Sequence, residues 1–168
     1  ALSSAASDVY KRQFKTDASD QLNSTKFGIP YAKKPLIFKG IYKYTPGDNY
    51  VDGSDKKNVL EHLEIVDECS IMAVLYEAVD SEGKEVILTG HDIASSEYRV
   101  AVAVLEDGGA KAEWTTFELP FNNLDGKSYD MSKSYKLAIV CSSSKDGAAF
   151  KGAVNSTLII DELEVIGE

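Results

Sequence analysis

The apolar residues of this chain fall in short runs, and almost none of them repeat with the period of an amphipathic helix. The runs are rich in Val, Ile, Tyr and Phe and are separated by clusters of Gly, Asp, Asn and Ser, which is the signature of strands and turns. Residues 58–66 alone suggest a short helical turn or an irregular segment. The candidate strands are residues 35–44, 64–79, 85–89, 98–105, 115–121, 135–142 and 157–166. This pattern predicts an all-β fold, an antiparallel β-sandwich.

Alternation within the strands indicates which faces are covered. Residues 98–105 are apolar on both faces apart from Arg99, as expected of a central strand that is buried on both sides. In residues 115–121 apolar and polar side chains alternate, so one face of that strand should meet solvent. The side chains on the polar side are Trp114, Thr116 and Glu118.

Size and charge narrow the class of protein. Residues 1–13 end in DVYKRQ, which resembles a translated sequencing adapter, so we treat them as a non-native or disordered leader. Residues 14–168 suit a single domain. The formal net charge of −9 and the lack of a basic cluster disfavour a nucleic acid partner. No apolar run reaches the length of about 18 residues that suggests a membrane-spanning helix.

The segment of residues 134–166 reads as two strands joined by a loop of small residues, with Asp161 inside the second strand. Regular alternation puts this carboxylate on one face with Ile159, Leu163 and Val165. A buried carboxylate needs hydrogen-bond donors, a cation or a proton. Asp161 is therefore a candidate ligand of a structural calcium ion or an acceptor of hydrogen bonds from loop amides.

Glu77 and Asp161 form the best candidate pair for acid and base chemistry, because alternation places both acids among apolar neighbours. Glycoside hydrolysis generally uses two carboxylates across a cleft. The alternative is that Glu77 faces solvent at a strand edge. The segment Thr89–Asp92 could also orient His91 through Asp92, but such a pair is more often a solvated turn.

Aromatic side chains are the candidates for sugar binding, because the C–H faces of a sugar ring pack on a flat apolar ring. Trp114 is the first candidate, with Glu118 on the same side of its strand. Tyr42 and Tyr76 are further candidates, although strands also favour Tyr for packing alone. The two cysteines, Cys69 and Cys141, could form one disulfide or remain two buried thiols.

Four segments together resemble a known family. They are KPLIFKGIYKYTPGDNY (34–50), DECSIMAVLYEAVD (67–80), EWTTFELPF (113–121) and the segment 134–166. In this order they resemble the putative carbohydrate metabolism domain over about residues 25–167. The resemblance implies a jelly-roll-like β-sandwich from exported, often lipid-anchored proteins of glycan-degrading gut bacteria. It also implies a preceding β domain in the full-length protein, as a candidate partner of this one.

The residues and the resemblance together favour a carbohydrate-binding module with a polysaccharide or oligosaccharide partner, located at the cell surface or in the periplasm. Two alternatives stay open. One is a glycoside hydrolase that acts through a carboxylate pair, so whether the chain is an enzyme is undecided. The other is an adhesin or assembly module without catalysis, since this kind of fold hosts all three functions.

Overall fold

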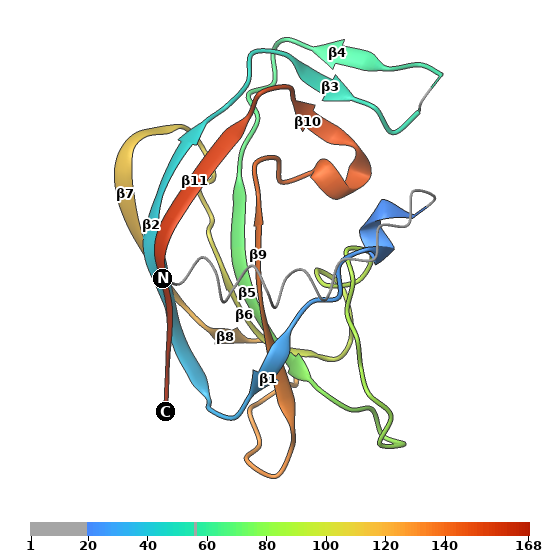
Figure 1. Ribbon diagram of the computed structural model, residues 1–168, viewed down its shortest axis with the longest axis vertical. Coiled ribbons are helices and arrows are strands. Elements are labelled where there is room, and N and C mark those ends of the chain that lie inside the picture. Colours follow the sequence, from blue (N-terminus) through green and yellow to red (C-terminus); the bar gives the residue numbers. More distant parts are fainter. Residues whose placement is uncertain (1–19, 56) are drawn as a thin grey trace.

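The computed structural model describes residues 20–55 and 57–168 and is all-β (Figure 1). The expected leader, residues 1–13, lies outside the described residues. The described helices are two short 3-10 helices, η1 (Gln21–Asn23) and η2 (Gly147–Ala149). No helix in the described part of the chain is long and apolar enough to cross a membrane. The strands are β1 (Ile29–Tyr31), β2 (Pro35–Thr45), β3 (Tyr50–Asp52), β4 (Leu60–His62), β5 (Ser70–Glu77), β6 (Arg99–Val104), β7 (Lys111–Pro120), β8 (Asn122–Asn123), β9 (Tyr135–Ser142), β10 (Lys151–Ala153) and β11 (Thr157–Gly167).

The strands form three sheets, in the orders β1-β9-β5-β6-β8, β11-β2-β7 and β10-β3-β4. Every pairing between the described strands is antiparallel, which confirms the predicted all-β class. Figure 1 shows the small sheet β10-β3-β4 at one end of the molecule, beyond the two larger sheets.

Three predicted segments differ from the observed strands. The strand expected over residues 64–79 begins only at Ser70. Residues 85–89 form isolated bridges at Glu85 and Leu88 and no extended strand. The segment expected to be helical or irregular, residues 58–66, contains β4. Strands of three residues carry too little alternation to be recognised in a sequence.

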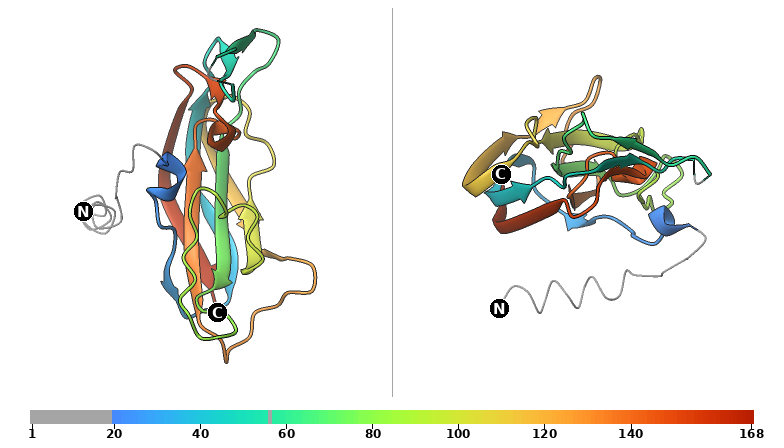
Figure 2. Two further views of the ribbon diagram at one scale, coloured as in Figure 1. Left: turned by 90° about the vertical axis from the view of Figure 1, so that its right-hand side faces the viewer. Right: turned by 90° about the horizontal axis from the view of Figure 1, so that it is seen from above.

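The two larger sheets share one apolar core. Phe38, Tyr42 and Tyr44 of β2 and Phe117 of β7 pack with Ile71, Ala73 and Ala103 of the five-stranded sheet. The ring of Phe117 packs edge-on against Phe38, with 5.2 Å between the ring centroids. The two turned views in Figure 2 show these sheets as stacked layers. Burial of this face is the main favourable term in the stability of such a domain.

The other face of the five-stranded sheet is also covered. The long connection between β5 and β6 folds back, so that Val86, Leu88 and Ile93 pack on Val74 and Tyr76. Phe27, from the segment before β1, contributes to the same cluster. The sequence prediction that residues 98–105 form a strand covered on both sides agrees with this arrangement, apart from Val104, which is exposed.

A buried carboxylate, Asp67, joins segments that are distant in the sequence. Its side chain is 2% exposed, and its Oδ2 atom accepts hydrogen bonds from Ser144 Oγ (2.6 Å), Ser156 Oγ (2.7 Å) and the Ala153 amide (2.8 Å). Its Oδ1 atom accepts the amide of Glu68 at 2.9 Å. All of its three long-range donors belong to the segment 142–164. The serines and small residues of this segment therefore supply the hydrogen-bond donors that the buried carboxylate of Asp67 requires.

The loop after β2 is fastened to the same place. The Gly47 amide donates to Ser156 Oγ at 3.1 Å. A Cβ atom at residue 47 would lie 1.9 Å from the carbonyl oxygen of Val154, so only glycine allows this close approach. The segment Gly40–Gly47 thus ends in a backbone contact that the fold requires.

The two cysteines are free, with Cys69 buried and Cys141 exposed. Cys69 directly precedes β5, and the register pairs Ile71 of β5 with Cys141 of β9, so the cysteines lie near each other as the disulfide interpretation needed. The structure nevertheless contains no bond between them. The alternative of two buried thiols holds for Cys69 and is wrong for Cys141.

Replacing Asp67 tests its structural role. We expect Asp67→Ala to lower the free energy of unfolding by about 3–5 kcal/mol, because it leaves buried donors without an acceptor. Asp125 is exposed, and Asp125→Ala is the matched control, with an expected change of at most about 0.5 kcal/mol. Denaturant unfolding followed by circular dichroism measures both. Equal stability of the two variants would contradict this role for Asp67.

Candidate functional site

The sheet β11-β2-β7 has one face that meets solvent. Directly opposed residues share a face of an antiparallel sheet, and the register pairs Ile41 of β2 with Thr116 of β7 and Asp161 of β11. Lys39 is likewise paired with Glu118 and Glu164. We call this face the outer platform. It consists of Lys39, Ile41, Lys43, Glu113, Trp114, Thr116, Glu118, Ile159, Asp161 and Glu164.

Trp114 lies at an irregularity of β7. The register passes from Tyr42–Thr115 to Tyr44–Lys111, so residues 112–114 lie opposite Lys43 alone. Such bulges re-aim side chains at sheet edges and functional sites. Here the indole is 47% exposed, and Lys43 Nζ lies 5.5 Å from its ring centroid, within the range of a cation–π interaction. The result is an open aromatic surface whose orientation the cation–π contact favours.

A row of charged groups crosses the outer platform further along the strands. Lys39 Nζ lies 2.9 Å from Glu164 Oε2, and Glu118 stands on the other side of Lys39 in the register. The hydrogen bond to Glu164 raises the pKa of the Lys39 ammonium, and the charge of Glu118 adds to this effect. The row therefore offers a fixed cation between two carboxylates for contact with hydroxyl groups.

Asp161 does not lie on an apolar, buried face, and that part of the sequence prediction is wrong. The register shifts between Asp161 and Glu164, Glu162 has φ of 54°, and Asp161 is exposed. The extra residue reverses the alternation of β11. Ile159 and Asp161 face outward, whereas Leu163 lies on the inner side of Gly40, with its Cδ2 atom 2.8 Å from the point where a Cβ of residue 40 would be. Leu163 is still 41% exposed, because β11 is an edge strand.

The calcium prediction for Asp161 gains no support. Asp161 Oδ1 accepts the amide of Glu162 at 2.8 Å. Within residues 20–55 and 57–168 no group of three or more His, Cys, Asp or Glu side chains could hold a metal ion. What the strand order β11-β2-β7 does bring together is Asp161 with Trp114 and Glu118, as members of one exposed face.

Tyr42 and Tyr76 are core residues, so their prediction as sugar-binding side chains is wrong. They are 1% and 0% exposed. The Tyr42 hydroxyl donates to the carbonyl of Asp107 at 3.3 Å, and the Tyr76 hydroxyl donates to that of Phe27 at 2.5 Å. Each hydroxyl thus binds a backbone acceptor at the edge of the core, which is the usual arrangement of a buried tyrosine.

Glu77 lies away from the outer platform, in a cleft of about 630 Å³. Glu77 is the last residue of β5, and that end of the strand is remote from the small sheet (Figure 1). Glu77 Oε1 accepts a hydrogen bond of 2.7 Å from Lys133, which raises the pKa of the lysine. The structure does not bring Glu77 and Asp161 into one cavity. The cleft is lined by Glu77, Val79, Asp80, Ser81, Glu97, Tyr98, Lys127, Ser132, Lys133 and Ser134.

Two acids besides Glu77 line this cleft, and they differ in how they are held. Asp80 Oδ1 accepts the amides of Glu82 and Lys84, both at 2.9 Å, so Asp80 shapes the turn that follows. The side chain of Glu97 forms no ion pair with any described residue. Glu97 is therefore the acid of this cleft that is free to meet a ligand beside Glu77.

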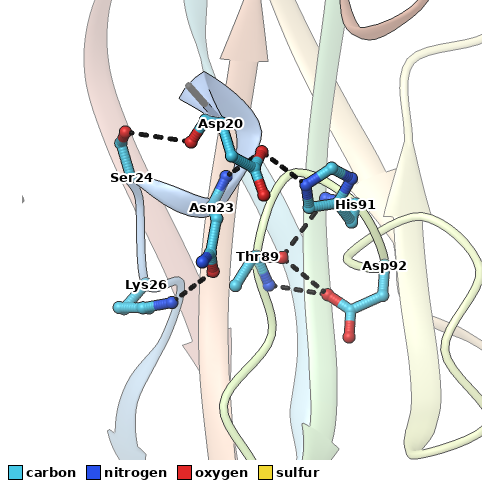
Figure 3. Close-up of polar contacts among 7 residues, drawn as sticks. All are labelled: Asp20, Asn23, Ser24, Lys26, Thr89, His91 and Asp92. Carbon is cyan, nitrogen blue, oxygen red and sulfur yellow. Dashed lines mark hydrogen bonds and ion pairs between the residues drawn. The ribbon is translucent and has the colours of Figure 1, made fainter. Parts of the chain in front are cut away.

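His91 belongs to a structural clamp (Figure 3). Its Nε2 atom lies 2.6 Å from Asp20 Oδ1, and Asp92 accepts from the Thr89 amide at 2.7 Å without contacting the imidazole. The Gly90 amide also donates to the Leu22 carbonyl at 2.8 Å. These contacts tie the segment around η1 to the turn at residues 89–92. The proposed orientation of His91 by Asp92 is wrong, because Asp20 holds the ring.

The sequence reasoning missed Lys39, Lys43 and Glu164 as members of the exposed face. A signal was present for the two lysines, since they alternate with buried residues in KGIYKYT, residues 39–45. No local signal places Glu164 beside Lys39, because the bulge at Glu162 changes the face on which Glu164 lies.

The sequence matches the family described as "Putative carbohydrate metabolism domain" over residues 2–166. The structure is similar to a crystal structure described as a putative glycoside hydrolase from Bacteroides thetaiotaomicron VPI-5482. The TM-score is 0.79 and the identity 37%, over 89% of this chain and 43% of that one. A second such structure, from Bacteroides vulgatus ATCC 8482, gives a TM-score of 0.75 and 36% identity over 89% of this chain and 59% of that one. The chain thus spans less than two thirds of either relative. No curated protein matches it.

Alkaline titration tests the burial of Tyr76. Burial raises the pKa of Tyr76 to about 12, above the value of about 10 in an unfolded chain. The raised pKa contributes to the free energy of unfolding. This contribution is fully present below about pH 10 and is lost as the pH rises through about 12, because only the unfolded state releases the proton of Tyr76 in that window. We expect the stability of Tyr76→Phe to fall less over this pH range. Denaturant unfolding at several pH values measures it, and an unchanged pH dependence would contradict the assignment.

Proposed function

This chain belongs to the putative carbohydrate metabolism domain family, and on that premise we propose that it is a carbohydrate-binding module whose binding surface is the outer platform. The observation that carries the proposal is the half-exposed indole of Trp114 on an open sheet face, with polar side chains beside it. The two similar solved structures, described as putative glycoside hydrolases, support a carbohydrate as the ligand.

The chemistry of the outer platform suits a sugar. The C–H face of a sugar ring can stack on Trp114, and Ile159, on the same platform, is 50% exposed. Thr116 and Glu118 follow Trp114 on the same face of β7 and can hydrogen-bond the hydroxyl groups at the rim of the ring. The ammonium group of Lys43 lies 5.5 Å from the ring centroid and favours one orientation of the indole, which lowers the ordering that stacking requires.

The proposal extends to the setting of the protein. A polysaccharide is too large to enter a cell intact, so a module that binds one belongs on an exported protein at the cell surface or in the periplasm. A lipid anchor and a preceding β domain fit the same setting. A jelly-roll-like β-sandwich, in which the sheets β11-β2-β7 and β1-β9-β5-β6-β8 are the two layers, would present the outer platform on an exposed layer.

A glycoside hydrolase is the second candidate function, and the cleft at Glu77 favours it. Glu77 and Glu97 both line this cleft, and hydrolysis generally needs two acids about 5–9.5 Å apart. Lys133 is hydrogen-bonded to Glu77 and would orient its carboxylate, as a nucleophile or base requires. Glu97 would then be the acid in this reading.

An adhesin or assembly module is favoured by a different surface. The hairpin of β3 and β4 and the segment that follows it carry exposed aliphatic side chains, and β4 is an edge strand of its sheet, features that are typical of contact surfaces. These side chains are Val59, Leu60, Leu63, Ile65 and Val66. An adhesin would use this end of the molecule and leave the outer platform free.

Trp114 is the only tryptophan in the chain, so its fluorescence reports directly on the outer platform. We expect neutral polysaccharides to shift its emission and to retard the full chain in native affinity electrophoresis. Trp114→Ala should weaken binding at least about tenfold, or ~1.4 kcal/mol. Phe150 is also an exposed aromatic residue, and Phe150→Ala is the matched control that should bind normally. Retention of full affinity by Trp114→Ala would overturn the proposed surface.

Release of reducing ends separates binding from catalysis. The binding proposal predicts none when the full chain is incubated with the polysaccharides that it retards. It also predicts normal retardation of Glu77→Gln, because Glu77 lies outside the outer platform. Release of reducing ends that disappears in Glu77→Gln would instead make the glycoside hydrolase the function. Asp125→Ala serves as a control for nonspecific effects of removing a carboxylate.

A further inference from the structure

The outer platform is organised in rows that cross the strands. One row contains Lys43 and Ile159, with Trp114 beside them at the bulge. The next contains Ile41, Thr116 and Asp161, and the third contains Lys39, Glu118 and Glu164. Alternate residues on one face of a strand are about 6.6 Å apart. The aromatic row and the charged row are therefore separated by about 13 Å along the strands.

We propose that the outer platform binds an uncharged, linear glycan of at least three sugar units that lies along β7, with one unit stacked on Trp114 and a unit further on hydrogen-bonded by Lys39, Glu118 and Glu164. This inference rests on the proposed carbohydrate-binding function and adds to it the length and charge class of the ligand. The first and third rows are about 13 Å apart along the strands, which is more than two linked sugar units span, so at least three consecutive units are needed to reach both.

The two ends of the outer platform differ in what they contribute. At the first row the contact surface is mainly apolar, since Trp114 and Ile159 are both about half exposed. Stacking there is tolerant of sugar identity because most pyranose rings present a C–H face. At the third row the ion pair between Lys39 and Glu164 fixes two polar groups at a distance of 2.9 Å. Donor and acceptor positions that are fixed in advance discriminate between hydroxyl orientations.

Charge decides against an acidic glycan. The outer platform carries two ammonium groups, Lys39 and Lys43, and four carboxylates, Glu113, Glu118, Asp161 and Glu164. Both lysines are already paired with carboxylates. The whole chain has a formal charge of −9. A glycan with uronate or sulfate groups would meet a negative surface without a free cation, and this repulsion slows association and lowers affinity.

The test uses the full chain and oligosaccharides of glucan, mannan and xylan from one to six units, with oligogalacturonate as the acidic probe. Binding is followed by Trp114 emission and by calorimetry. For the neutral series that binds, we expect affinity to rise at least about tenfold from one unit to three. Lys39→Met should weaken binding of the trisaccharide about tenfold and leave the monosaccharide unchanged. The matched control is Lys84→Met, since Lys84 is exposed and lies outside the outer platform.

The outcomes separate this inference from the proposed function. A monosaccharide that binds as tightly as the trisaccharide, or full affinity in Lys39→Met, would overturn the inference while carbohydrate binding stands. Preferential binding of oligogalacturonate at low salt would overturn the charge argument in the same way. If no oligosaccharide changes Trp114 emission or releases heat, then the proposed function and the inference both fail. Thermal unfolding of each variant verifies that the fold is intact.

Discussion

The carboxylate of Asp67 is the contact on which the arrangement of the sheets depends. It accepts hydrogen bonds from Ser144, Ala153 and Ser156, which belong to the connections that lead out of β9 and into β11. Ser156 directly precedes the first residue of β11, which pairs with Thr45 of β2. Ser156 also accepts the Gly47 amide from the loop after β2. Asp67 thus fixes the point at which the pairing of β11 with β2 begins. The register of these two strands, and with it the arrangement of the outer platform, follows from that point.

Two irregularities then shape the outer platform. On one edge, the extra residues of β7 opposite Lys43 expose Trp114 beside that lysine. On the other edge, the bulge at Glu162 uses the space above Gly40 to seat Leu163 inward. A non-glycine residue at positive φ costs about 1–3 kcal/mol and persists where the surrounding structure holds it. Here the gain is that Asp161 and Glu164 both face solvent on the outer platform.

Much of the fold could be predicted from the sequence, because the longer strands alternate clearly and are separated by turn residues. The residues of β9 were predicted without error, and the exposed side of β7 was identified by the positions of Trp114 and Glu118. The failures have physical causes. A bulge is invisible to a rule of alternation, which is why Asp161 was expected to be buried. Tyrosine suits both the core and the surface, so Tyr42 could not be assigned by its residue type.

The candidate site was less accessible to prediction than the fold. Trp114, Glu118 and Asp161 were selected individually, but their meeting on one face depends on the order β11-β2-β7, which brings together strands far apart in the sequence. The role of Asp67 could not be foreseen, because its donors lie 77 to 89 residues further along the chain. A local pattern can show that a carboxylate needs partners, but it cannot show which carboxylate a distant group of serines serves.

The bulge in β11 also bears on how this surface can diverge between relatives. Loss of one residue between positions 161 and 164 would remove the bulge and still leave Glu164 opposite Lys39. If the segment kept its length and lost the bulge, regular alternation from Asp161 would instead place Leu163 opposite Lys39 and turn Glu164 to the inner face. The presence of the bulge, together with the length of this segment, is therefore the first property to compare among relatives when asking whether they share a ligand.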